Sequence, residues 1–287
     1  MHRFADVGAT LACMNSPANS DIVAFIGGGN MASAIIGGLR RQGMPAEQFL
    51  VVEPHASQRE KLLADFSITA LAQPEASLTR ASQVVWAVKP QSFREAAAQV
   101  APHTTGALHL SVMAGITSSS MAQQLSVQRI VRAMPNTPAL IGLGIAGLYA
   151  RPAVSDTDKQ RIEVLIATTG EHLWLTDESQ IDAVTALSGS GPAYVFYFIE
   201  AMMRAGQSMG LSEAQARHLA QSTFAGAAQL ARQSSESPDV LRQRVTSKGG
   251  TTYAAITAMQ EAQLGEHFEK ALHAAHQRAA QLGKEFG

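Results

Sequence analysis

The chain has 287 residues, of which 46% are apolar, and its formal net charge at pH 7 is −1. This composition is typical of a globular protein with a sizeable core, and it gives no electrostatic basis for binding nucleic acid or an anionic membrane surface. The longest apolar run, Pro192 to Ile199, is too short to cross a bilayer, so we expect a cytoplasmic protein without membrane contact.

Residues 1–20 are expected to form a mobile N-terminal extension. The one cysteine, Cys13, lies there, which excludes an intrachain disulfide and a cysteine-based zinc site and argues against a catalytic thiol. We therefore expect no metal. Met14 offers a second translation start, so whether residues 1–13 are translated stays open.

A glycine cluster follows the first strand-like run, Ile22 to Ile26, and a helix-like stretch from Ser33 to Arg41 comes after it. The cluster has the pattern G-x-G-x-x-A, in which the glycines allow a tight turn and close approach of a pyrophosphate, and the small last residue keeps the helix near the strand. This context favours a dinucleotide site over a glycine-rich turn without function. The predicted coenzyme-binding residues here are Ile26, Gly27, Gly28, Gly29, Asn30 and Met31.

The second strand-like run, Phe49 to Val52, ends in Glu53, and the residues that follow bear on the choice of coenzyme. A carboxylate at this position accepts from a ribose 2′-hydroxyl and repels a 2′-phosphate, which favours NADH. His55, Ser57 and Arg59 argue the other way, because a hydroxyl and a guanidinium near a helix N-terminus suit a 2′-phosphate. We choose NADPH and keep NADH as the alternative.

Short apolar runs continue to alternate with helical patterns up to residue 177, which predicts a Rossmann-type doubly wound α/β sheet over residues 21–177 with parallel strands at its centre. The further predicted strands are 84–88, 108–112, 129–133, 145–149 and 172–175, with helices at 57–66 and 156–168 among those between them. Ligands of such sheets bind at the carboxyl ends of the strands.

Three segments at predicted strand ends are candidates for this site. Ala87, Val88, Lys89 and Pro90 place a lysine beside the nicotinamide half of the coenzyme, although a solvated strand end is the alternative. Ala114 and Gly115 are small enough for a flat ring to approach. Asn136 lies between two prolines, in either a ligand-facing loop or a structural turn.

Residues 178–287 have the pattern of an all-helical domain. Pro192 begins one helix, Ser212 and Gln215 form a capping box for the next, and further helices begin near Pro238, Gly250 and Leu264. Apolar residues nearly surround the first helix between residues 194 and 203, so it should be buried. We expect a helical dimer interface, with a tight intrachain core as the alternative.

Two segments within residues 178–287 contain candidate substrate-binding residues. Thr185, in a turn rich in small residues, offers a neutral hydroxyl that suits a protonated imine nitrogen, although the turn could simply cap the following helix. Ser247, Lys248, Gly249, Gly250, Thr251 and Thr252 place two glycines and hydroxyls before a helix. Such a loop is either an anion site for a carboxylate or phosphate, or a loop before a capped helix.

Five blocks in order now carry a family resemblance, which covers about residues 21 to 284. They are residues 26–31, 87–90, 132–138, 187–194 and 245–252. Together they resemble the pyrroline-5-carboxylate reductase family.

The resemblance implies hydride transfer from NAD(P)H to the C=N carbon of 1-pyrroline-5-carboxylate, which yields L-proline. It implies that Ser247, Gly249, Gly250, Thr251 and Thr252 bind the substrate carboxylate, and that Thr185 contacts the ring nitrogen. Thr185 and Lys89 are the predicted catalytic residues. It also implies a homodimer through the C-terminal helices, which in this family often assembles into a decamer. Orientation and electrostatics suffice for such a reaction without an acid–base pair.

One residue departs from the family pattern, because Lys248 stands where the family has proline in Ser-Pro-Gly-Gly. We expect retained activity with altered substrate affinity, and an unchanged KM in Lys248→Pro would contradict this.

Two other classes fit parts of the sequence. A β-hydroxyacid type dehydrogenase would need a helical catalytic lysine, and between Thr176 and Leu282 the lysines are Lys248 and Lys270, in the glycine loop and on a charged helix. A nucleotide sensor without turnover is the second alternative.

Overall fold

The computed structural model describes residues 21–286, and the N-terminal extension with Cys13 and Met14 lies outside them. The described chain forms two compact units, one of residues 21–181 together with 281–286, and one of residues 182–280. None of the helices between residues 21 and 286 is both long and apolar enough to cross a membrane.

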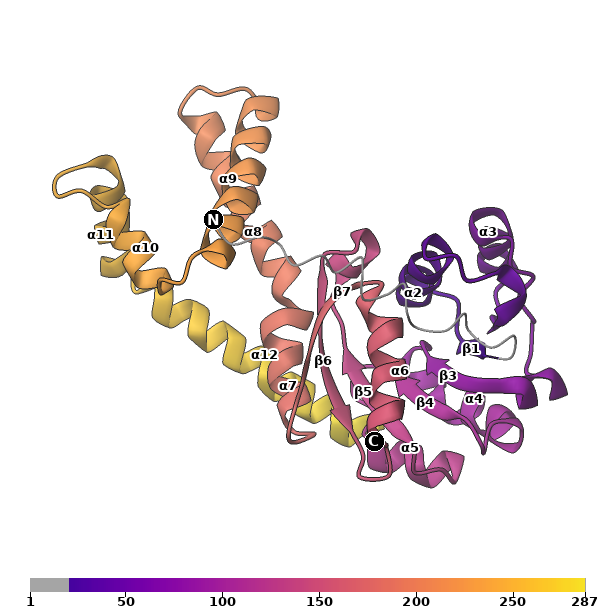
Figure 1. Ribbon diagram of the computed structural model, residues 1–287. Coiled ribbons are helices and arrows are strands. Elements are labelled where there is room, and N and C mark those ends of the chain that lie inside the picture. The colour runs from indigo at the N-terminus through magenta and orange to yellow at the C-terminus, as the bar shows by residue number, and fades with distance from the viewer. Residues whose placement is uncertain (1–20, 287) are drawn as a thin grey trace. The chain divides into compact units, whose positions relative to one another are not determined.

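The first unit is built on a seven-stranded sheet with the order β2-β1-β3-β4-β5-β6-β7 (Figure 1). All neighbouring strands are parallel except β5 and β6, which pair antiparallel. The strands are β1 (Ile22–Ile26), β2 (Phe49–Val52), β3 (Ala81–Trp86), β4 (Leu108–Ser111), β5 (Ile130–Met134), β6 (Gly144–Ala150) and β7 (Gly170–Trp174). The predicted doubly wound sheet is confirmed: β1 and β2 have the predicted bounds, and the ends of the other strands differ from the prediction by at most three residues.

Helices cover both faces of this sheet because each central strand is apolar on both sides. Val23 and Phe25 of β1 belong to one buried cluster, whereas Ala24 and Ile26 belong to the other. The helices of the unit are α2 (Asn30–Arg41), α3 (Ala56–Phe66), α4 (Phe93–Val100), α5 (Ser118–Leu125) and α6 (Asp156–Ala167). The next helix, α7 (Gln180–Val184), begins in this unit, and its residues from Asp182 belong to the second. Short 3₁₀ turns join them: η2 (Ala46–Gln48), η3 (Ala76–Arg80), η4 (Pro90–Ser92), η5 (Ala101–His103) and η6 (Thr137–Ile141).

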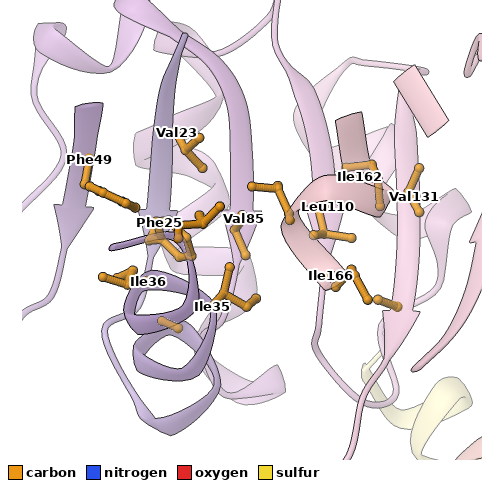
Figure 2. Packing of buried hydrophobic residues seen from close by; sticks show 14 of the residues in the cluster. Val23, Phe25, Ile35, Ile36, Phe49, Val85, Leu110, Val131, Ile162 and Ile166 are labelled. Carbon is orange, nitrogen blue, oxygen red and sulfur yellow. The ribbon is translucent and has the colours of Figure 1, made fainter. Parts of the chain in front are cut away.

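Figure 2 shows the first cluster, in which Ile35 and Ile36 of α2 lie near Phe25 on the sheet. Ile166 of α6 and Leu110 of β4 extend the same cluster. On the opposite face, the second cluster takes its helical residues from α4 and α5. Burial of these two faces fixes the sheet, and with it the positions of the strand ends.

The second unit is helical, as predicted. It contains η7 (Thr185–Gly189), which is a π-helical turn, α8 (Gly191–Ser208), α9 (Glu213–Gln233), α10 (Pro238–Arg244), α11 (Thr251–Glu261) and α12 (Leu264–Phe286), whose residues from Gln281 belong to the first unit. The predicted capping box is confirmed, because Ser212 Oγ accepts from the Gln215 N–H and the Gln215 side chain from the Ser212 N–H.

Helix α8 corrects one expectation, since its apolar side chains are not buried within this single chain. Phe196 is 59% exposed and Tyr197 is 64% exposed. The alternative of a tight intrachain core around this helix is therefore wrong for the described chain.

Candidate coenzyme and substrate sites

The carboxyl ends of β1, β2 and β3 meet at one edge of the sheet. The Gly27 N–H donates to the Val52 carbonyl at 2.8 Å, and the Ala87 N–H donates to the Ile26 carbonyl at 2.8 Å. The strand order reverses direction between β1 and β3, which is the point where doubly wound sheets bind ligands.

The three glycines after β1 differ in what a side chain at each position would meet. Gly27 has φ +93°, and a Cβ there would lie 2.6 Å from the Ala87 carbonyl oxygen. At Gly28 a Cβ would lie 2.6 Å from a methyl group of Leu62 in α3. Apart from Gly29 itself and its two chain neighbours, no described residue has an atom within 4 Å of the Cβ position at Gly29, so this backbone is open to a ligand. The loop therefore fits the pyrophosphate of a dinucleotide.

A hollow of about 510 Å³ lies beside this loop, within the size range of small-molecule sites. It is lined by Gly27, Gly29, Glu53, Pro54, His55, Ser57, Gln58, Ala87, Val88, Lys89 and Ser92. A second hollow of about 370 Å³ shares Gly27, Pro54, Val88 and Ser92 with it and extends to Glu95 and Gln99 of α4. Of the predicted residues that follow β1, β2 and β3, the structure thus brings the following together around the larger hollow: Gly27, Gly29, Glu53, Ser57, Ala87, Val88 and Lys89.

Glu53 and Arg59, both predicted to read the ribose, make contacts with the protein backbone. The buried Glu53 carboxylate accepts from the Gly28 N–H at 2.8 Å and from the His55 N–H at 2.9 Å. Arg59 Nη1 donates to the carbonyls of Glu53 at 3.0 Å and Pro54 at 2.6 Å. Ser57 is exposed in the first turn of α3, on the wall of the hollow.

Gln58 was not among the predicted residues, yet it contacts the glycine loop directly. Its side-chain amide donates to the Gly28 carbonyl at 2.5 Å, and it lines the larger hollow. The only sequence signal for it is an amide side chain in the first turn of the helix that follows Glu53.

The two other predicted coenzyme segments are held by contacts within the protein. Gly115 has φ +74°, and a Cβ there would lie 3.1 Å from Cβ of Leu282, so its small size serves packing against the end of α12. The Asn136 side-chain oxygen accepts from the Ile145 N–H at 3.0 Å, as a structural turn would.

Near the end of the first unit, Glu178 joins α5 to β5. Its carboxylate accepts from the Ser118 N–H at 2.6 Å and hydroxyl at 2.5 Å, and from Arg132 at 2.7 Å. Burial opposes ionisation, but the hydrogen bonds from Ser118 and the charge of Arg132 outweigh it and lower the pKa of Glu178. This ion pair joins the segment after β7 to α5 and β5.

Thr185 begins a π-helical turn, Thr185–Gly189, which leads into α8. Its carbonyl accepts from the Ser190 N–H at 2.9 Å, and the Tyr194 hydroxyl donates to the Ala186 carbonyl at 3.1 Å. The Thr185 side chain is half-buried. Turns of this type occur frequently at functional sites.

The glycine loop before α11 has the backbone of an open helix N-terminus. Gly249 has φ +74°, and Gly250 takes the N-cap position, where it supplies no side-chain cap. The Gly250 N–H donates to the Ser247 carbonyl at 3.0 Å, and a Cβ on Gly250 would lie 2.7 Å from Ser247 Oγ. The first turn of α11, with Thr251 and Thr252, therefore suits an anion. Lys248 is exposed beside it.

Comparisons with known proteins match both halves of the chain. Residues 178–282 match the family model for pyrroline-5-carboxylate reductase dimerisation, and residues 22–115 match that for NADP oxidoreductase, coenzyme F420-dependent. The chain is 45% identical to a pyrroline-5-carboxylate reductase of Pseudomonas aeruginosa over 92% of its own length and 98% of the relative's. It is 40% identical to that of Haemophilus influenzae, over 91% and 97%.

Solved structures of pyrroline-5-carboxylate reductases also match the fold of this chain. A pyrroline-5-carboxylate reductase from Coxiella burnetii matches with a TM-score of 0.84 and 35% identity, covering 92% of this chain and 99% of that one. The Plasmodium falciparum pyrroline carboxylate reductase, solved with NADP bound, matches with a TM-score of 0.83 and 25% identity, covering 92% and 98%.

Proposed function

We propose that this chain, which belongs to the pyrroline-5-carboxylate reductase family, reduces 1-pyrroline-5-carboxylate to L-proline with NADPH as hydride donor. The observation that carries the proposal is the open glycine loop at the reversal of strand order, within a chain that shares more than nine-tenths of its length with these reductases.

The coenzyme site that we propose lies in the first unit. The backbone of residues 26–31 receives the pyrophosphate, because Gly29 is open and α2 begins directly after it. Ser57 and the N-terminus of α3 offer donors to a 2′-phosphate, which supports NADPH over NADH. Ala87, Val88 and Lys89 border the same hollow, where the exposed Lys89 ammonium is placed to contact the ribose or the substrate, and Pro90 follows them directly. Ala114, Gly115 and Asn136 stay predictions.

The substrate residues that we propose lie in the second unit. Ser247, Gly249, Gly250, Thr251 and Thr252 bind the carboxylate through hydroxyls and helix N–H groups. Thr185 contacts the ring nitrogen with a neutral group, which leaves the positive charge of the protonated imine in place. The coenzyme supplies the hydride, and the protein supplies orientation and electrostatic stabilisation.

We further propose that two copies pair through the C-terminal helices, because residues 178–282 match a dimerisation family and α8 exposes a large apolar surface. The decamer and the cytoplasmic location stay predictions.

The activity can be tested by measuring NADPH and NADH oxidation with 1-pyrroline-5-carboxylate and with 1-pyrroline, which lacks the carboxylate. We expect turnover with 1-pyrroline-5-carboxylate. With 1-pyrroline we expect a kcat/KM at least about a hundredfold lower, because this compound has no carboxylate to form charge-assisted hydrogen bonds in the anion site. Equal kcat/KM values for the two compounds would refute the carboxylate site, and coenzyme binding without turnover would favour the sensor.

A further inference from the structure

Side chains hold Gly28 of the glycine loop at both of its backbone polar groups. Its N–H donates to the Glu53 carboxylate at 2.8 Å, and its carbonyl accepts from the Gln58 amide at 2.5 Å. The Ser33 hydroxyl adds a longer contact of 3.3 Å to the same carbonyl. We call Glu53 and Gln58 the Gly28 clamp.

The Glu53 carboxylate is bound to the backbone on both of its oxygens. Glu53 lines the hollow beside the loop but is only 6% exposed, and its second oxygen accepts from the His55 N–H at 2.9 Å. The nearby Arg59 guanidinium donates to the Glu53 and Pro54 carbonyls. Each carboxylate oxygen thus already accepts a backbone hydrogen bond, whereas a ribose-reading carboxylate directs its oxygens at the sugar hydroxyls.

The clamp opposes the freedom that three successive glycines give to this loop. Glycine loses more conformational entropy on ordering than any other residue, so an unsupported loop of this kind would have to be ordered by its ligand. Contacts that order the loop beforehand remove that cost from binding. Leu62 supports the same residue, since it leaves no room for a Cβ at Gly28.

We infer that Glu53 and Gln58 are positioning residues that act through Gly28, set the affinity for both coenzymes, and do not discriminate between NADPH and NADH. Discrimination then falls to the exposed first turn of α3, with Ser57. The inference rests on the proposed function only for the identity of the ligand.

The test measures the dissociation constants of NADPH and NADH by fluorescence titration, without substrate, for Glu53→Gln and Gln58→Ala. The first change leaves one acceptor oxygen for the two backbone N–H groups of Gly28 and His55, so one of them faces an amide NH2, and the second change removes a donor. We expect both dissociation constants to rise together, about tenfold in Glu53→Gln and about fivefold in Gln58→Ala, as expected for the loss of one hydrogen bond each. In turnover assays KM for the coenzyme should rise while kcat stays within about twofold.

Two further variants sharpen the result. Glu60→Gln, which changes an exposed charge on the same helix, should bind both coenzymes as the unmodified protein does. The double variant Glu53→Gln/Gln58→Ala should lose less affinity than the product of the two single losses, because both side chains act on one residue.

The inference is overturned if Glu53→Gln changes the NADPH/NADH ratio of dissociation constants more than about threefold, or if neither variant weakens binding. If circular dichroism shows that Glu53→Gln is not folded, the dissociation constants of Gln58→Ala test the inference by the same criteria. Because substrate is absent from the titration, failure of the proposed reaction would not be confused with failure of the clamp.

Discussion

At the scale of single residues, His109 shows how the sheet holds a titratable ring in a neutral state. The Trp86 indole N–H donates to His109 Nδ1 at 3.0 Å, and Nε2 lies 3.0 Å from the Thr104 carbonyl oxygen, so the ring proton belongs on Nε2. Burial is the main reason that the pKa of His109 falls to about 4. The ring is therefore neutral at physiological pH, and its role is to pack and form hydrogen bonds within the core.

This histidine should make the first unit less stable in mild acid. Between pH 6.5 and 4 the unfolded chain binds a proton that the folded chain does not, so stability falls as pH falls, by about 3 kcal/mol from this residue. The measurement is the free energy of unfolding against pH for the unmodified protein and His109→Gln. The variant should lack this part of the pH dependence, and parallel curves would contradict the assignment.

At the scale of elements, the end of α12 packs on the loop that follows β4. Leu282 faces Gly115, with its Cβ 3.1 Å and its carbonyl oxygen 3.2 Å from the Cβ position there. Phe286 packs against the cluster that α4 and α5 cover. A helix at the end of the chain thereby supports one of the strand ends near the coenzyme site.

Gly115→Ala should weaken this contact more than a matched glycine change elsewhere. Gly142 has nearly the same φ, +73°, but apart from its own chain neighbours no described residue has an atom within 4 Å of its Cβ position. Gly142→Ala therefore bears only the backbone cost of about 1 kcal/mol, and Gly115→Ala should cost about 1 to 2 kcal/mol more because backbone must shift. Thermal unfolding of the two variants measures the difference, and equal losses would show that Leu282 moves freely.

At the scale of the whole molecule, the second unit lacks an apolar core of its own. The buried hydrophobic residues between 182 and 280 are all alanines: Ala186, Ala216, Ala220 and Ala279. Several of its larger apolar side chains, among them Phe196 and Tyr197, are exposed, and the others are only half-buried. A surface of this kind fits the proposed dimer interface.

Phe196→Glu should therefore weaken self-association, because it places a charge within the apolar surface of α8. We expect the dimer dissociation constant, measured by sedimentation equilibrium, to rise at least about a hundredfold. Lys61→Glu, which adds negative charge to the exposed face of α3, is the control and should leave it unchanged. Persistent dimers in Phe196→Glu would move the interface away from this helix.

The sequence alone was sufficient for features that depend on neighbouring residues. Apolar runs located β1 and β2, the glycine spacing placed the loop after β1, and Ser212 with Gln215 marked the start of α9, because periodicity and capping are local. Five ordered blocks identified the family, which the relatives confirm. Only the tertiary structure decided where Glu53, Arg59 and Gly115 direct their contacts. Gln58 lies 30 positions from Gly28, and that contact depends on how α3 packs, which no local pattern encodes.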